Sequence, residues 1–220
     1  LDAPGFSFED DGGRTAVKKW INQIRTVDMF VLVVRGFHDD SVPAYRGSVD
    51  AERDVKELLN EFLIMDLDLV STRIEKLKLQ VQKGGKDQEK DKEELERQLR
   101  LQSALIEEKP ASHVIKSDRE IEIVKSLNLL TLKPVTVVVN VDESDIGKEL
   151  DFSKIVDASV PVISVCAKIE QELSLLDEDS KTEFMADLGI SESAAGIFVK
   201  GCYAAMGLIS FLTVGPDEVR

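Results

Sequence analysis

The chain has 220 residues, which suits one large domain or two small ones, and its hydrophobic content of 43% excludes wholesale disorder. Its net charge of -14 at pH 7 excludes binding of a polyanion by the surface as a whole, so any nucleic-acid contact must use a local basic patch. No apolar run reaches the roughly 18 to 20 residues of a membrane span, and we therefore expect a cytoplasmic protein without membrane contact. Cys166 and Cys202 have no C-x-x-C spacing, which predicts buried thiols and no zinc site.

The first residues, Asp2-Ala3-Pro4-Gly5, fit the pattern D-x-x-G. In P-loop proteins this pattern follows a core strand, where the Asp helps, indirectly, to hold Mg2+ and the Gly amide senses the γ-phosphate. Two fixed positions match by chance in most proteins, so the weight of the pattern comes from the polar switch-like segment, helix and strand that follow it. Phe6 stands where many GTPases have a Gln, and its side chain cannot orient a water. The catalytic residue is therefore unknown.

Short, nearly all-apolar runs along the chain predict strands buried on both faces of a parallel sheet, at 29–34, 135–140 and 161–165. Helical patterns lie between and around them, at 14–25, 117–127, 167–175, 180–188 and 191–206. This alternation predicts an α/β fold with right-handed crossovers. Sheets of this kind bind ligands at the carboxyl ends of their strands.

The stretch from 50 to 109 breaks the alternation and predicts two long helices. In the first helix a heptad seam runs through Leu63, Leu67, Val70, Ile74, Leu77 and Val81. After Gly84-Gly85 the repeat continues at Leu95, Leu99, Gln102 and Ile106. Folding the chain back at the glycines gives pairs with a constant index sum: Ile74 with Leu95, Val70 with Leu99, Leu67 with Gln102 and Leu63 with Ile106. The sequence therefore predicts an antiparallel coiled coil with its turn at Gly84-Gly85.

The predicted turn is locally basic at Lys83, Lys86 and Lys90, although acidic residues are interleaved with these lysines. A solvated charged face is the ordinary interpretation of such a segment. The alternative is a contact with a polyanion such as ribosomal RNA.

The predicted strand at 135–140 runs directly into Asn140-Val141-Asp142-Glu143, at the place where guanine-specific GTPases carry N-K-x-D. The Asp of that motif accepts two hydrogen bonds from guanine. Glu143 occupies its place here and Val141 replaces the Lys, so we expect weak selection of guanine and tolerance of adenine. The alternative is an ordinary turn at the start of a helix.

The next predicted strand ends in Ser164-Val165-Cys166-Ala167, where the same fold places a loop whose backbone amides touch the base. The predicted base-binding residues are therefore Asn140, Val141, Glu143, Ser164, Cys166 and Ala167. Motifs in the right order at successive strand ends are stronger evidence than any one of them.

The pattern G-x-x-x-x-G-K-[ST] of a phosphate-binding loop does not occur in the 220 residues. Because Leu1 is not an initiator Met and the first residues look like the end of a core strand, we expect this loop to precede Leu1 in the whole protein. Without its amides and lysine, the chain alone should bind nucleotide poorly and be inactive.

Longer segments resemble the family of YchF-type, Obg-like ATPases. The family patterns N-K-F-L-x-x-I-R-x-x-D, V-V-R-x-F-x-D-D, T-L-K-P-V, N-x-x-E and G-P-x-E-V-R are similar to residues 18–28, 33–40, 131–135, 140–143 and 215–220. The resemblance implies a Ras-like P-loop NTPase domain, with a mainly parallel sheet, helices on both faces and an inserted coiled coil. The G-domain parts would be 1–50 and 111–220, the insertion 51–110, and a TGS domain would follow.

The resemblance also implies a preference for ATP over GTP, dependence on Mg2+ and a link to ribosomes. By matching positions, Asn140, the Val141 backbone and Glu143 would meet the base, and Asp2 and Gly5 the magnesium and γ-phosphate region. The alternative, from a different class, is a non-hydrolysing scaffold or interaction module that retains the fold.

Overall fold

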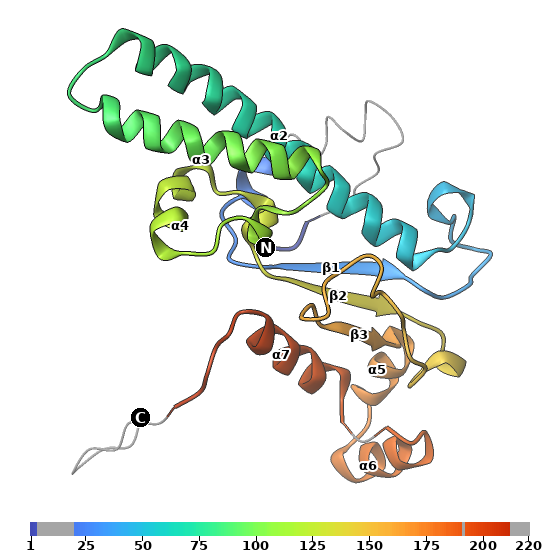
Figure 1. The fold of residues 1–220 in the computed structure, drawn as a ribbon. Helices are drawn as coiled ribbons and strands as arrows, with labels where there is room; N and C mark the ends of the chain where they lie inside the picture. Colours follow the sequence, from blue (N-terminus) through green and yellow to red (C-terminus); the bar gives the residue numbers. More distant parts are fainter. Residues whose placement is uncertain (4–19, 191, 212–220) are drawn as a thin grey trace, which may run out of the picture. The chain divides into compact units, whose positions relative to one another are not determined.

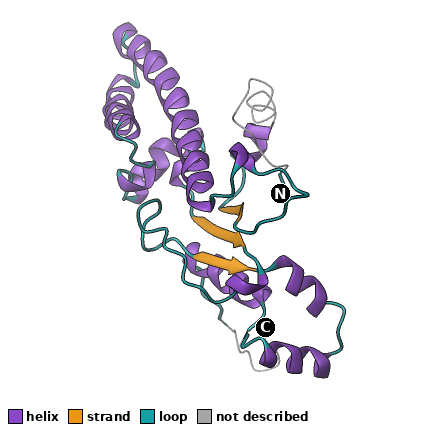
Figure 2. Ribbon diagram, turned by 90° about the vertical axis from the view of Figure 1, so that its right-hand side faces the viewer, coloured by secondary structure: helices purple, strands orange, loops and turns teal. Residues whose placement is uncertain are grey.

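The computed structural model describes residues 1–3, 20–190 and 192–211. Helices make up most of its regular structure (Figure 2). The chain forms two compact units. The first comprises Leu1–Phe30, Ala44–Ser48 and Glu52–Pro134, and the second Val31–Pro43, Val49–Ala51 and Val135–Arg220. The division at 1–50, 51–110 and 111–220 stays a prediction.

The second unit is built on a sheet of order β1-β2-β3 (Figure 1). The strands are β1 (Phe30–Arg35), β2 (Val135–Asn140) and β3 (Val162–Val165). β2 and β3 are parallel, with Val138 opposite Ile163. The three predicted strands are confirmed to within a residue at each end, because runs of valine suit a pleated, buried surface.

The sheet differs from the expectation of strands buried on both faces at β3, where only Ile163 is buried, and at β1. β2 is buried on both faces, but β1 alternates, with Leu32 buried and Val33 68% exposed. β1 is the last strand of the sheet order, and the helix α7 (Ala194–Ala205) contacts β2 and β3. Among the described residues, one face of β1 is therefore left uncovered.

Helices α5 (Ala167–Leu173), α6 (Glu178–Asp187) and α7 follow the sheet. The side chains of Asp177 and Ser193 cap α6 and α7 by accepting backbone hydrogen bonds. A Cβ atom on Gly201 of α7 would lie 2.8 Å from Ile163 Cδ1, so the glycine allows the helix to approach β3 closely. A small core formed by Cys166, Ile169 and Leu173 joins α5 to residues of the α6 region.

The first unit contains α2 (Ala51–Lys83), α3 (Gln88–Ile106) and α4 (Asp118–Val124). Residues 20–24 are also helical. Figure 1 shows α2 and α3 running side by side in opposite directions. Gly84 and Gly85 in their connection have φ angles of 71° and 142°, which favour glycine. The helical hairpin and its turn are as predicted, whereas coiled-coil packing stays a prediction.

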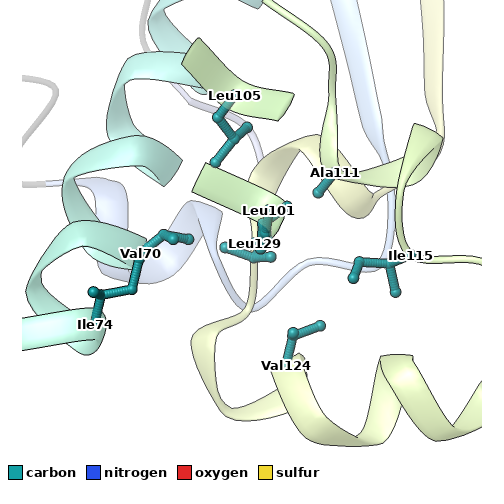
Figure 3. Close-up of a cluster of buried hydrophobic side chains, with 8 residues drawn as sticks. All are labelled: Val70, Ile74, Leu101, Leu105, Ala111, Ile115, Val124 and Leu129. Carbon is teal, nitrogen blue, oxygen red and sulfur yellow. The ribbon is translucent and has the colours of Figure 1, made fainter. Parts of the chain in front are cut away.

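The buried face of α2 follows the predicted seam, with Val70, Ile74 and Leu77 buried. The predicted face of α3 is wrong at Leu99 and Ile106, which are 40% and 64% exposed, although Leu95 packs against the core cluster and Gln102 binds Ser71 of α2. The buried residues of α3 are Gln98, Leu101, Ala104 and Leu105. The physical reason is visible in Figure 3, where Leu101 and Leu105 share one cluster with side chains of α2, α4 and the segments around Ala111 and Leu129. A heptad pattern predicts only the contacts between two helices, so it does not predict which side of α3 these additional neighbours bury.

Candidate functional site

The carboxyl ends of the three strands carry the residues that the sequence singled out for base binding. β2 ends at Asn140 and β3 at Val165, and these two residues lie opposite each other in the parallel register. β1 ends one residue before Gly36, whose amide donates to the Asn140 carbonyl oxygen over 2.7 Å. All three loops therefore leave the sheet on the side formed by the carboxyl ends of its strands, which is where parallel sheets bind ligands. We call this side the open edge of the sheet.

Asn140 connects the two predicted base-binding segments. Its side-chain Oδ1 accepts a hydrogen bond from the Ala167 amide at 3.1 Å, at the first residue of α5. One residue further on, the Val141 amide donates to the Val165 carbonyl oxygen over 2.8 Å. The short β2 strand delivers both groups because its valines are buried and hold the strand end against β3.

The other predicted base-binding residues are placed less uniformly. Glu143 is exposed at the start of the short 3-10 helix Glu143–Asp145, and Ala167 is exposed at the start of α5. Cys166 is only 7% exposed, and Ser164 lies within β3 opposite Val139. The Val141 side chain is buried and its amide is already paired. Asn140 and Glu143 are thus the members of this set with polar side chains near the open edge of the sheet, and the Ala167 amide there is bonded to Asn140.

Sequence reasoning missed the loop 36–43 after β1. The Arg35 guanidinium donates hydrogen bonds to the carbonyl oxygens of Phe37 at 2.9 Å, Asp39 at 3.0 Å and Val42 at 2.9 Å. Its Cζ atom also lies over the Phe37 ring, 4.5 Å from the ring centroid. The signal was present as an arginine at the end of a predicted strand, followed by a glycine. A guanidinium in this place can donate hydrogen bonds to several carbonyl oxygens of the loop that follows.

Gly36 allows this loop to lie against the end of β2. A Cβ atom at Gly36 would lie 2.8 Å from Val139 Cγ1 and 3.3 Å from the Asn140 carbonyl oxygen. The next contact is made by His38, whose amide donates to Asp142 Oδ2 over 3.2 Å. The loop is therefore attached to the Asn140–Glu143 segment at both its first and third residues.

The loops at the open edge, 35–43 and 140–148, carry five acidic residues and two basic ones, so this edge has a net negative charge. Hydrogen bonds from the Ser41 hydroxyl and amide hold the pKa of Asp39 below its ordinary value, and the ion pair with Lys148 does the same for the pKa of Asp145. Both carboxylates are therefore ionised at neutral pH. This edge suits the uncharged base of a nucleotide better than its phosphates.

Of the three residues predicted to lie near the phosphates, only Asp2 is among the described residues. Asp2 is exposed, and Gly5 and Phe6 lie outside the described residues. Magnesium needs several oxygen ligands in near-octahedral geometry. The part of the chain that the structure describes contains no group of three or more His, Cys, Asp or Glu side chains that could hold a metal. The indirect role of Asp2 toward Mg2+ therefore stays a prediction.

The hairpin turn presents its lysines to solvent. Lys83, Lys86 and Lys90 are all exposed. Lys90 lies 3.5 Å from Asp87, and Lys92 lies 2.8 Å from Glu89. The interleaved acidic residues thus take up part of the positive charge.

Over the described ranges, no helix combines the length and the apolar character needed to cross a membrane.

Comparison with known proteins gives a consistent result. No protein-family model matches the chain. The ribosome-binding ATPase YchF of Bacillus subtilis is 36% identical over 92% of this chain and 56% of the relative, and that of Mycoplasma pneumoniae is 33% identical over 100% and 62%. Obg-like ATPase 1 of Schizosaccharomyces pombe is 31% identical over 91% and 54%. The chain thus spans little more than half the length of these curated relatives.

A solved structure agrees with the sequence comparison. The structure of the Schizosaccharomyces pombe YchF GTPase aligns with a TM-score of 0.77 and 30% identity, over 91% of this chain and 56% of that chain. The likeness therefore extends over nearly all of this chain.

Proposed function

Because this chain belongs to the family of YchF-type, Obg-like ATPases, we propose that the whole protein is a magnesium-dependent P-loop hydrolase that prefers ATP to GTP. The chain would contribute the base-binding half of a Ras-like nucleotide site, with a helical hairpin inserted as a coiled coil. The hydrogen bond from the Ala167 amide to Asn140 Oδ1 supports this proposal, because it holds the two predicted base-binding segments together at the open edge of the sheet.

The preference for ATP rests on the residues that come after Asn140. Guanine selection in N-K-x-D proteins uses a short carboxylate that accepts two hydrogen bonds, with a lysine stem covering the base. Glu143 is longer by one methylene and lies on an exposed 3-10 turn, and Val141 is buried, so no lysine stem is supplied from that position. Asn140 and the Val141 carbonyl remain as groups that a purine amine can meet.

The test of base selection is the affinity of the whole protein for ATP and GTP, measured by titration calorimetry. Wild-type protein should bind ATP more tightly, and Glu143→Asp should shift the ratio of the two dissociation constants toward GTP. Glu149→Asp, at another exposed position of the same segment, is the matched control and should leave the ratio unchanged. A wild-type protein that favours GTP contradicts the proposed base selection.

We further propose that the nucleotide state governs binding to a ribosome in the cytoplasm, as the names of the relatives suggest for those proteins. The hairpin turn would supply the contact with ribosomal RNA through Lys83, Lys86 and Lys90. Each phosphate contact that is lost should lower the salt dependence of binding by about one unit of slope on a log-log plot.

Charge reversal tests this contact. Changing Lys83, Lys86 and Lys90 to Glu should weaken ribosome binding and flatten its salt dependence, measured by co-sedimentation at several salt concentrations. The matched control reverses three exposed lysines elsewhere: Lys56, Lys125 and Lys154. Equal effects in the two triple variants contradict a contact at the turn.

Nucleotide binding without measurable hydrolysis would favour the scaffold alternative, for which Phe6 in place of a water-orienting Gln is the supporting observation.

A further inference from the structure

The Arg35 side chain folds the loop 36–43 into one shape. Its guanidinium donates to carbonyl oxygens of three residues spread over that loop, and its plane lies over the ring of Phe37. A planar fork with fixed donor directions is suited to gathering several acceptors at once, whereas a lysine ammonium is not. The shape of the loop therefore depends on the guanidinium and not only on its charge.

The folded loop reaches the base-binding segment through one side chain. The His38 amide donates to Asp142 Oδ2, and Asp142 lies between Asn140 and Glu143. Asp142 is also the residue that precedes the 3-10 helix Glu143–Asp145, a position where an Asp side chain usually accepts a hydrogen bond from the helix backbone. It makes no such capping bond. Its carboxylate is instead directed to the loop after β1.

We propose that Arg35 and Asp142 are positioning residues of the nucleotide site, which set the orientation of the Asn140–Glu143 segment through the loop 36–43 without touching the nucleotide. The inference rests on the proposed function of that segment. Arg35 shapes the loop, the loop presents the His38 amide, and the Asp142 carboxylate binds that amide. The first turn after β2 is thereby fixed, and with it the direction in which Glu143 faces the base.

The first test is the kinetics of ATP hydrolysis by the whole protein. Asp142→Ala should raise KM for ATP about tenfold, which corresponds to about 1.4 kcal/mol, and change kcat less than about twofold, because binding is lost and not chemistry. Asp142→Asn keeps an oxygen acceptor at the same place and should restore most of the affinity. Asp40→Ala, an exposed residue of the same loop, should behave as wild type. An unchanged KM in Asp142→Ala overturns the proposal, as does an Asn variant no better than Ala.

The second test asks whether Arg35 acts through Asp142. Arg35→Lys keeps the charge and should raise KM in the same way, but combining it with Asp142→Ala should add nothing beyond Asp142→Ala alone. Additive effects contradict the chain of contacts.

Amide exchange of the nucleotide-free protein separates this inference from the proposed function. The His38 amide should exchange about tenfold faster in Asp142→Ala and in Arg35→Lys than in wild type, which corresponds to about 1.4 kcal/mol of lost protection. Unchanged exchange overturns the tether whatever the ligand is. If wild-type protein binds neither ATP nor GTP, the proposed function fails, and the exchange rates alone decide whether the two residues position this segment.

Discussion

The Nη1 atom of Arg25 lies 2.7 Å from the Oδ1 atom of Asp66. Asp66 belongs to α2, and its side chain is completely buried. Asp66 also accepts hydrogen bonds from the amides of Leu130 and Thr131, at 3.1 and 2.8 Å, and from the Thr131 hydroxyl at 2.9 Å. Arg25 donates further to the carbonyl oxygen of Met65 at 3.1 Å. This one carboxylate thus joins three segments of the first unit that are far apart in the sequence.

Removing this carboxylate should destabilise the protein strongly. Asp66→Ala leaves the Arg25 charge and two backbone amides without their acceptor, and breaking a buried pair in this way costs about 3–5 kcal/mol of unfolding free energy. Chemical denaturation followed by circular dichroism measures the loss. Asp68→Ala, two residues along the same helix but exposed, is the control and should change the free energy by less than about 0.5 kcal/mol. Equal effects would show that the network does not stabilise the unit.

A methyl group at Gly36 should not fit. Gly36→Ala places a Cβ atom against Val139 and the Asn140 carbonyl oxygen, neither of which can move freely, and overpacking of this kind costs about 1–3 kcal/mol. Thermal or chemical unfolding is the measurement. Gly196→Ala is the matched control, because its new methyl group meets only the flexible Glu192 side chain and alanine favours a helix by about 1 kcal/mol. The control should be neutral or stabilising, and a neutral Gly36→Ala would contradict the close approach.

Glu120 should make stability depend on acid pH. Hydrogen bonds from the Lys116 amide, the Arg100 guanidinium and the Ser117 amide lower the pKa of Glu120 from 4.5 to about 2. The unfolded chain therefore takes up this proton first, so the stabilisation by Glu120 is complete above pH 4.5 and is lost as the pH falls toward 2.

The measurement is the unfolding free energy of wild type and Glu120→Gln as a function of pH. The difference between them should be constant from pH 7 to pH 4.5 and should shrink below that value. Glu122→Gln, in the same helix α4 but with a 73% exposed side chain, should show no comparable change. A difference between wild type and Glu120→Gln that does not vary with pH would contradict the lowered pKa.

Gln98 should be replaceable by an apolar residue. Its side chain is fully buried, and neither its amide nitrogen nor its amide oxygen has a hydrogen-bond partner among the described residues. An unsatisfied buried polar group costs about 1–3 kcal/mol, so Gln98→Met should raise the unfolding free energy by an amount in this range. The control is Gln102→Met on the same helix, which loses the 2.8 Å bond to Ser71 and should destabilise by about 0.5–1.5 kcal/mol. A destabilised Gln98→Met would show that the buried amide is satisfied after all.

Much of the fold follows from local patterns. The positions of β1, β2 and β3 are predicted to within a residue at each end, because short runs rich in β-branched and apolar residues favour strands. The buried face of α2 and the turn at Gly84-Gly85 are likewise set by spacing and by glycine's access to positive φ. The sequence also placed Asn140 and Ala167 at the ends of successive strands, but only the structure shows that the Ala167 amide binds Asn140 Oδ1.

Other features depended on contacts between residues that are distant in sequence. Leu99 was predicted to be buried and Gln98 was not, because only the tertiary structure determines which neighbours besides α2 surround α3. Asp66 resembles the other charged residues of a long helix until Arg25 and Thr131 are brought to it. The sequence by itself therefore determined the family, the strands and the helical hairpin, whose signals are local and periodic. The tertiary structure decided the face of α3, the buried ion pair and the loop held by Arg35, since each depends on which distant groups satisfy a buried or charged side chain.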